Sequence, residues 1–298
     1  MHHGRGDRPT SGYFNNPTVT EDWPDDEDLQ RAHVQSDRGR WYCKGWAEAI
    51  LTNEENDNLQ TTFHAMIDTM GPTERYLMEN VEASEEDITV IAESLRRGKV
   101  RMVSDGSFFK HTKIATFDVR IENDEKTHMI KAKQFVPGNP EFMDSYRAEC
   151  AGLLAGFIIL STLCKYEDID EGGAKVGCDG KSALDMAFRE VWDARSSDKH
   201  FDMIYVMQSW YRKIPLRLKR HWIKGHQDEK IPFRRLDRMS QLNVLCDESA
   251  KALGRQLPTS TIPSEIHLDL WRLEVGGKTV VHNVEVTLRE WIHDPKLK

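Results

Sequence analysis

The spacing of apolar residues changes near residue 99. Between about residues 29 and 70 apolar residues fall in patches at helical spacing. Ser84-Glu85-Glu86-Asp87 then precedes Ile88, Ile91 and Leu95, which predicts a capped helix ending at Gly98. After residue 99 the pattern becomes strand-like. It predicts strands over 100–109, 113–121 and 127–136, with a polar turn at 122–125 between the last two.

Helical and strand patterns alternate over the next hundred residues. Helices are predicted over 145–165, 181–193, 202–212 and 239–254, and strands over 174–178 and 220–224. The order of elements is therefore βββαβααβα. Three antiparallel strands followed by alternating elements predict an α/β fold with a mixed five-stranded sheet and helices on both faces.

These patterns divide the chain into three regions. Residues 1–98 form an acidic, partly disordered and partly helical N-terminal region, in which 1–28 have few aliphatic side chains. Residues 99–256 carry the α/β domain. Residues 257–298 form an extension, with a hairpin expected at Gly276-Gly277 and a helix over 284–293.

Charge and cysteine content narrow the possible partners and compartments. The net charge is −8, yet residues 1–98 hold 9 basic and 20 acidic residues while 99–256 hold 27 basic and 23 acidic ones. Only the middle region is therefore a candidate for a polyanionic partner. No run of about eighteen apolar residues occurs, so no membrane span is expected. The five cysteines show no Cys-x-x-Cys spacing, which indicates a reducing, intracellular environment and small buried cysteines.

Four acids follow or begin the predicted elements. Asp105 stands where the first strand should end, Glu149 in the first turns of the long helix, Asp179 after the fourth strand and Asp247 at the start of the last helix. Asp105 taken alone favours a turn in an Asp-Gly-Ser hairpin, and only the other acids along the chain outweigh that interpretation. Together the four carboxylates would repel one another unless cations bind, and such oxygen ligands suit Mg²⁺ or Mn²⁺.

The motifs around these acids resemble the type 1 ribonuclease H family over residues 99–256. They are Ser104-Asp105-Gly106-Ser107, Tyr146-Arg147-Ala148-Glu149, Cys178-Asp179-Gly180-Lys181-Ser182-Ala183-Leu184, Trp222-Ile223-Lys224-Gly225-His226 and Asn243-x-x-x-Asp247-x-x-Ala250. The sequence Gly-His-Gln-Asp after the last strand most resembles the corresponding sequence in the ribonuclease H-like domain of retroelement reverse transcriptase polyproteins. Two departures are a longer, charged segment between His226 and Asp247, and Gly180 in place of a small polar residue.

The resemblance implies a site and an activity. It makes Asp105, Glu149, Asp179 and Asp247 ligands of two Mg²⁺ ions, with Mn²⁺ able to substitute. It makes His226 a proton shuttle or an aid to product release. The expected activity is metal-dependent hydrolysis of the RNA strand of RNA–DNA hybrids, in a chain whose partner is the rest of a retroelement polyprotein. An inactive nucleic-acid-binding module and a protein–protein module stay as alternatives.

A basic stretch from Ser209 to Lys224 holds six Lys or Arg residues and no acid. It is either a solvated helix end or a phosphate-binding ridge with aromatic side chains beside it. The candidate nucleic-acid contacts are Trp210, Arg212, Lys213, Arg217, Lys219, Arg220 and Lys224.

Overall fold

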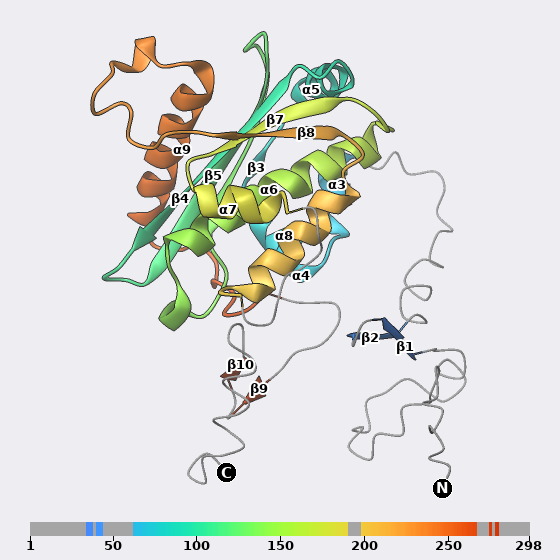
Figure 1. Ribbon diagram of the computed structural model, residues 1–298, viewed down its shortest axis with the longest axis vertical. Coiled ribbons are helices and arrows are strands. Elements are labelled where there is room, and N and C mark those ends of the chain that lie inside the picture. Colours follow the sequence, from blue (N-terminus) through green and yellow to red (C-terminus); the bar gives the residue numbers. More distant parts are fainter. Residues whose placement is uncertain are drawn as a thin grey trace, which may run out of the picture. The chain divides into compact units, whose positions relative to one another are not determined.

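The computed structural model describes residues 62–189 and 198–266 in full, together with short strands at 34–37, 40–43, 274–275 and 278–279 (Figure 1). The chain divides into two compact units, Met1–Gln60 and Thr61–Lys298. In the first unit β1 (Val34–Asp37) pairs antiparallel with β2 (Arg40–Cys43). The helical patches expected from about residue 29 are thus wrong at these positions, where a local strand pair forms instead.

The second unit is built on a six-stranded sheet with the order β3-β6-β5-β4-β7-β8. Its strands are β3 (Val81–Glu82), β4 (Val100–Phe109), β5 (Ile114–Asn123), β6 (Met129–Phe135), β7 (Gly173–Cys178) and β8 (Arg217–Trp222). Strands β4, β5 and β6 form an antiparallel meander, whereas β7 lies parallel to β4 and β8 parallel to β7. The carboxyl ends of β4, β7 and β8 therefore point to the same edge of the sheet.

Helices cover both faces of this sheet (Figure 1). They are α3 (Phe63–Asp68), α4 (Pro72–Met78), α5 (Glu85–Arg96), α6 (Ser145–Tyr166), α7 (Lys181–Ala187), α8 (Phe201–Lys213) and α9 (Arg238–Gly254), with short 3₁₀ turns at Pro140–Phe142 and Phe233–Arg235. Successive residues of β4 point to opposite faces. Met102 lies against α6, and Val103 packs with Met239 and Leu242 of α9. The predicted α/β class and order βββαβααβα are confirmed, with one more strand than expected.

Helix α6 is the central element of the core. Its N-cap Asp144 accepts a hydrogen bond from the backbone N–H of Arg147, and its side chains are buried around nearly the whole circumference. Gly156 permits this packing, because a Cβ there would lie 2.0 Å from Met102 Cε. Among the described helices α6 has the length and hydropathy of a membrane span, but 89% of the span's window is buried inside the protein. It has the burial expected of a core helix in a folded domain.

Residues 62–98 belong to the same core as the α/β domain. Phe63, Leu77, Ile88 and Ile91 are fully buried there, and β3 extends the sheet by pairing with β6. The Ser84 capping box expected from the sequence is present on α5. The compact unit therefore starts at Thr61, not at residue 99, because these apolar side chains complete the core against α6 and the sheet.

The hairpin expected in the C-terminal extension is present. β9 (Glu274–Val275) pairs antiparallel with β10 (Lys278–Thr279), with two residues between them. The helix expected over 284–293 and the acidic segment 1–28 lie outside the described residues.

Candidate active site

The four predicted acids come from four elements that meet at one edge of the sheet. Asp105 is the sixth residue of β4 and lies beyond the last pair between β4 and β7, Val103↔Gly177. Glu149 is in the second turn of α6, and Asp179 directly follows β7. Asp247 lies on α9. Burial, followed by the charges of Glu149, Asp179 and Asp247, raises the pKa of Asp105, so these three acids lie near Asp105 in one centre.

Close backbone packing makes this convergence possible. A Cβ on Gly106 would lie 2.5 Å from the backbone carbon of Ala148, so only glycine lets β4 approach the start of α6. A Cβ on Gly180 would lie 2.7 Å from Cγ of Glu149. Gly180 thus makes room for the Glu149 side chain.

Burial and mutual repulsion disturb the carboxyl groups of this centre. Asp105 is only 4% exposed, and burial, followed by the charges of Glu149, Asp179 and Asp247, raises its pKa to about 10. Burial and then Asp179 raise the pKa of Glu149 to about 8. Burial also raises the pKa of Asp179, against the opposing effects of Asn243 and His226. Asp105, Glu149 and Asp179 therefore lack enough positive charge from the chain itself to offset burial.

The donors of the centre fit divalent cations. Carboxylate oxygens are the ligands that Mg²⁺ and Mn²⁺ prefer, and a bound cation would supply the missing positive charge. One atom from each of Glu149, Cys178 and Asp179 lies within 4.8 Å of the others. The Cys178 thiol donates to Glu149 Oε2 at 3.3 Å, and burial raises its pKa well above the usual range. Cys178 is therefore a neutral donor to Glu149, and the hard ligands are the carboxylates.

Asn243 is a member of the site that was not among the predicted site residues. It lies on α9 one turn before Asp247, and its Nδ2 donates to Asp105 Oδ2 at 3.4 Å. It also hydrogen-bonds to Asp179. Its buried Oδ1 has no partner within the described part of the chain, so this oxygen has unused acceptor capacity. The i, i+4 spacing of Asn243 and Asp247 was the signal that could have identified it.

Asp247 and His226 lie at the open side of the centre. Lys251, one turn further along α9, contacts Asp247 Oδ2 at 2.7 Å. His226 follows β8 on an exposed turn with a positive φ of 54°, and its side chain is 68% exposed. Gly225 before it lies so close to Asp179 that a Cβ would be 2.6 Å from Oδ2. His226 is therefore near Asp179 but makes its contact with Glu229, at 3.5 Å.

The structure distributes the predicted nucleic-acid contacts over two elements. Trp210 on α8 donates its indole N–H to Glu74 of α4 at 3.0 Å, and Lys213 lies 4.1 Å from the centroid of its ring. Arg212 is also on α8. Arg217, Lys219 and Arg220 lie on the edge strand β8, and Lys224 follows it.

These basic residues differ in their distance from the acids along β8. Because β8 runs parallel to β7, Arg217 pairs with Gly173 at the far end of the strand, and Trp222 pairs with Cys178 beside Asp179. Arg220 forms an exposed ion pair with Asp185 at 3.0 Å. Trp222 and Lys224 are thus the residues of this stretch at the end of β8 nearest the acids. Trp222 was not among the predicted nucleic-acid contacts.

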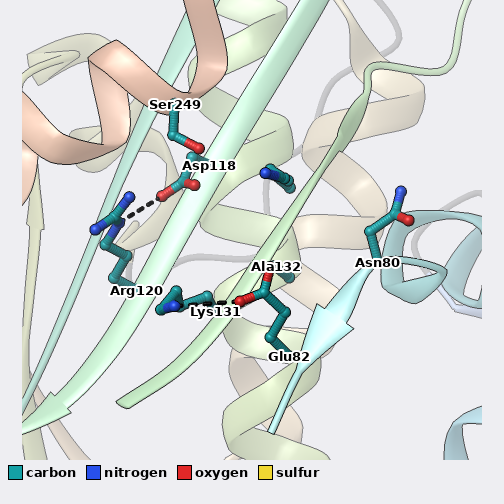
Figure 2. Close-up of a pocket in the computed structure, with 8 residues that line it drawn as sticks. Asn80, Glu82, Asp118, Arg120, Lys131, Ala132 and Ser249 are labelled. Carbon is teal, nitrogen blue, oxygen red and sulfur yellow. Dashed lines mark hydrogen bonds and ion pairs between the residues drawn. The ribbon is translucent and has the colours of Figure 1, made fainter. Parts of the chain in front are cut away.

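A polar pocket lies on the sheet near the C-terminal part of α9 (Figure 2). Asp118 in this pocket is the cross-strand neighbour of Asp105, but it pairs with Arg120 at 3.0 Å. Lys131 pairs with Glu82 at 3.1 Å (Figure 2). Asp118, Arg120, Lys131 and Glu82 are thus compensated within the chain, unlike Asp105 and Glu149 of the acidic centre.

The chain is similar to known proteins in structure and not in sequence. No protein-family model and no curated protein matches it. Among solved structures, the chain is similar to the N-terminal RNase H domain of rv2228c from Mycobacterium tuberculosis, solved as a fusion with maltose-binding protein. The identity is 14%, the match covers 53% of this chain and 96% of that chain, and the TM-score is 0.33. A similarity at this level supports no conclusion about the activity of this chain.

Proposed function

We propose that this chain is a metal-dependent endonuclease that hydrolyses the RNA strand of RNA–DNA hybrids. The observation that carries the proposal is the acidic centre. Burial and mutual repulsion raise the pKa of Asp105 to about 10 and of Glu149 to about 8, beside Asp179 and Asp247. Carboxylates held in such an array are stable as anions only when cations neutralise them.

The chain's own residues have separate tasks in this reaction. Asp105, Glu149, Asp179 and Asp247 would hold the cations, and Asn243 orients Asp105 through its amide. If two divalent ions were held there, they would supply activation of the attacking water and stabilisation of the departing 3′ oxygen. His226, near Asp179 on an exposed turn, is suited to transfer a proton at the departing oxygen.

The choice of substrate and the wider context are further parts of the proposal. The A-form-like shape of a hybrid and the 2′-hydroxyls of its RNA strand would select that strand for hydrolysis. The basic residues of β8 and Lys224 would contact phosphates. The sequence Gly225-His226-Gln227-Asp228 supports an origin in a retroelement polyprotein, whose other parts would be the partners of this chain.

The decisive test is an incubation of the full chain with three labelled duplexes: an RNA–DNA hybrid, duplex DNA and duplex RNA. Each is tested with Mg²⁺, with Mn²⁺ and with a chelator. We expect cleavage of the RNA strand of the hybrid only, and only with a divalent cation. Binding to the hybrid without cleavage in either cation would contradict the proposal and favour a nucleic-acid-binding module.

A further inference from the structure

Trp222 is an exposed aromatic ring beside the acidic centre. Four large hydrophobic side chains in the described part of the chain are exposed. Two of them are aromatic, and Trp222, with 53% of its surface exposed, is the more exposed of these two. Indole rings usually bury most of their area, because this contributes strongly to stability. An exposed ring at this place has apolar surface left for contact with a ligand.

The ring is also held in position. Trp222 ends β8, where it pairs with Cys178, and its indole N–H donates to the backbone oxygen of Asp179 at 2.9 Å. The strand restrains the backbone and the hydrogen bond restrains the side chain. A ligand that stacks on this ring therefore loses little of the entropy that ordering a free side chain would cost.

The surroundings of the ring favour a polyanion. Lys181 and Lys224 are exposed and lie within two residues of Asp179 and Trp222, respectively. Arg220 points to the same side of β8 as Trp222, since residues two apart share a face, and it pairs with the exposed Asp185. An exposed aromatic ring with cationic residues nearby in the chain is a combination that binds single-stranded nucleic acid.

We propose that Trp222 stacks on an unpaired nucleotide of the substrate, next to the phosphate that lies at the acidic centre. A fully paired hybrid keeps its bases stacked inside the duplex, so an external ring has no base face to contact there. The preferred substrate is then a hybrid with a single-stranded extension beside the scissile position. This inference rests on the proposed function and specifies its substrate.

The test measures binding of two fluorescent probes, a blunt hybrid and the same hybrid with an unpaired RNA extension. All proteins carry Asp105→Asn, so that hydrolysis does not consume the probe, and Mg²⁺ is present throughout. We expect Trp222→Ala to raise the Kd for the extended hybrid by about 5-fold to 150-fold and the Kd for the blunt hybrid by less than about 2-fold. Trp222→Phe, which keeps a ring, should retain most of the affinity.

Leu257→Ala is the matched control, since Leu257 is 89% exposed and its loss removes apolar surface elsewhere. It should bind both probes as the parent does. An unchanged Kd for Trp222→Ala, or an equal loss for both probes, would overturn the inference. Cleavage by the chain with Asp105 intact is measured in parallel. If that chain cleaves nothing while the Trp222 effect on the extended probe persists, the proposed function fails and the stacking site stands.

Discussion

Two clusters of charged side chains each include a residue from the same turn of α6, and they differ in how their charge is balanced. The first surrounds Arg147, which is fully buried and contacts both oxygens of the buried Asp202, at 2.8 and 2.7 Å. His200 joins this cluster and also contacts Asp144 at 2.9 Å. The second is the acidic centre around Glu149, two residues further along the same helix.

The pKa shifts in the two clusters have opposite directions. Burial acts to raise the pKa of Asp202, but the charge and hydrogen bonds of Arg147 outweigh it, and the pKa falls. Burial opposes a low pKa at Asp144 as well, where bonds from His200, Lys199 and the backbone of Arg147 prevail. In the acidic centre burial acts in the same direction as repulsion. The chain thus supplies its own counter-charge in the first cluster, whereas in the second the pKa values of Asp105, Glu149 and Asp179 stay raised.

The largest expected effect is on cleavage. Asp105→Asn should abolish hydrolysis of the hybrid, because it removes a ligand from the centre. Without divalent cations its melting temperature should stay the same or rise, since the neutral Asn never takes on the charge that burial and the other three acids disfavour. Gel assays and thermal melts in a chelator measure both.

Asp118→Asn is the matched control, as Asp118 is the cross-strand neighbour of Asp105 but pairs with Arg120. It should keep cleaving and melt at a lower temperature. Near-normal cleavage by Asp105→Asn would refute the assignment of the metal site.

Substitution of the two histidines near these clusters should have different effects. His226→Ala should lower turnover by about 10² to 10⁴, the usual contribution of a general acid or base, with Mg²⁺ affinity unchanged. His200→Ala, at a residue only 1% exposed, should lower stability instead. Turnover assays and calorimetric titration with Mg²⁺ separate the two. A large fall in Mg²⁺ affinity of His226→Ala would identify His226 as a ligand.

Breaking the balanced cluster should cost stability. Arg147→Met leaves Asp202 buried without its partner and should lower the free energy of unfolding by about 3–5 kcal/mol. Urea denaturation at neutral pH measures this. The double variant Arg147→Met/Asp202→Leu removes both charges and should recover much of the loss. If the double variant is no more stable than the single one, packing and not charge explains the effect.

Cations should stabilise the chain through the acidic centre. At about 100 times its Kd, Mg²⁺ should add about 2.7 kcal/mol to the free energy of unfolding if it binds only the folded state. The Arg147→Met variant, measured at low denaturant, should show the same gain in the free energy of unfolding with Mg²⁺. The Asp105→Asn variant should show little gain. Denaturation curves at several Mg²⁺ concentrations test this, and an equal gain in the Asp105→Asn variant would place the bound ion elsewhere.

The smallest expected effect is the response of the balanced cluster to acid. Because the pKa values of Asp144 and Asp202 are lowered in the folded state, their contribution is complete above the unfolded pKa of about 3.9 and is lost as the pH falls below it. Urea denaturation between pH 7 and pH 3 should show this loss. The Arg147→Met/Asp202→Leu variant should lose less stability over the same range, and an identical loss would assign the acid response to other groups.

Local sequence determined the elements of this protein and the identity of its acids. Alternating apolar residues predicted β4, β5 and β6, and the apolar run after Ser145 predicted α6, because these signals depend on neighbours in the chain. Asp105, Glu149, Asp179 and Asp247 could be selected from the motifs around them. The structure places Glu149 and Asp179 near element ends as expected, but Asp105 is the sixth residue of β4 and Asp247 lies in the middle of α9. The sequence did not reveal that residues 62–98 complete the core. β3 is two residues long, and its pairing with β6 depends on contacts far along the chain.

Tertiary structure alone decided which side chains face the centre. Trp210 and Trp222 lie in the same basic stretch, yet one donates to Glu74 on α4 and the other to Asp179 at the acidic edge. Asp105 and Asp118 are both acids on neighbouring strands, but only Asp118 has an arginine beside it. A sequence shows the type and order of such groups. Their burial and their partners are set by long-range packing, and these two quantities determine whether a charge is balanced by the protein or left for a ligand.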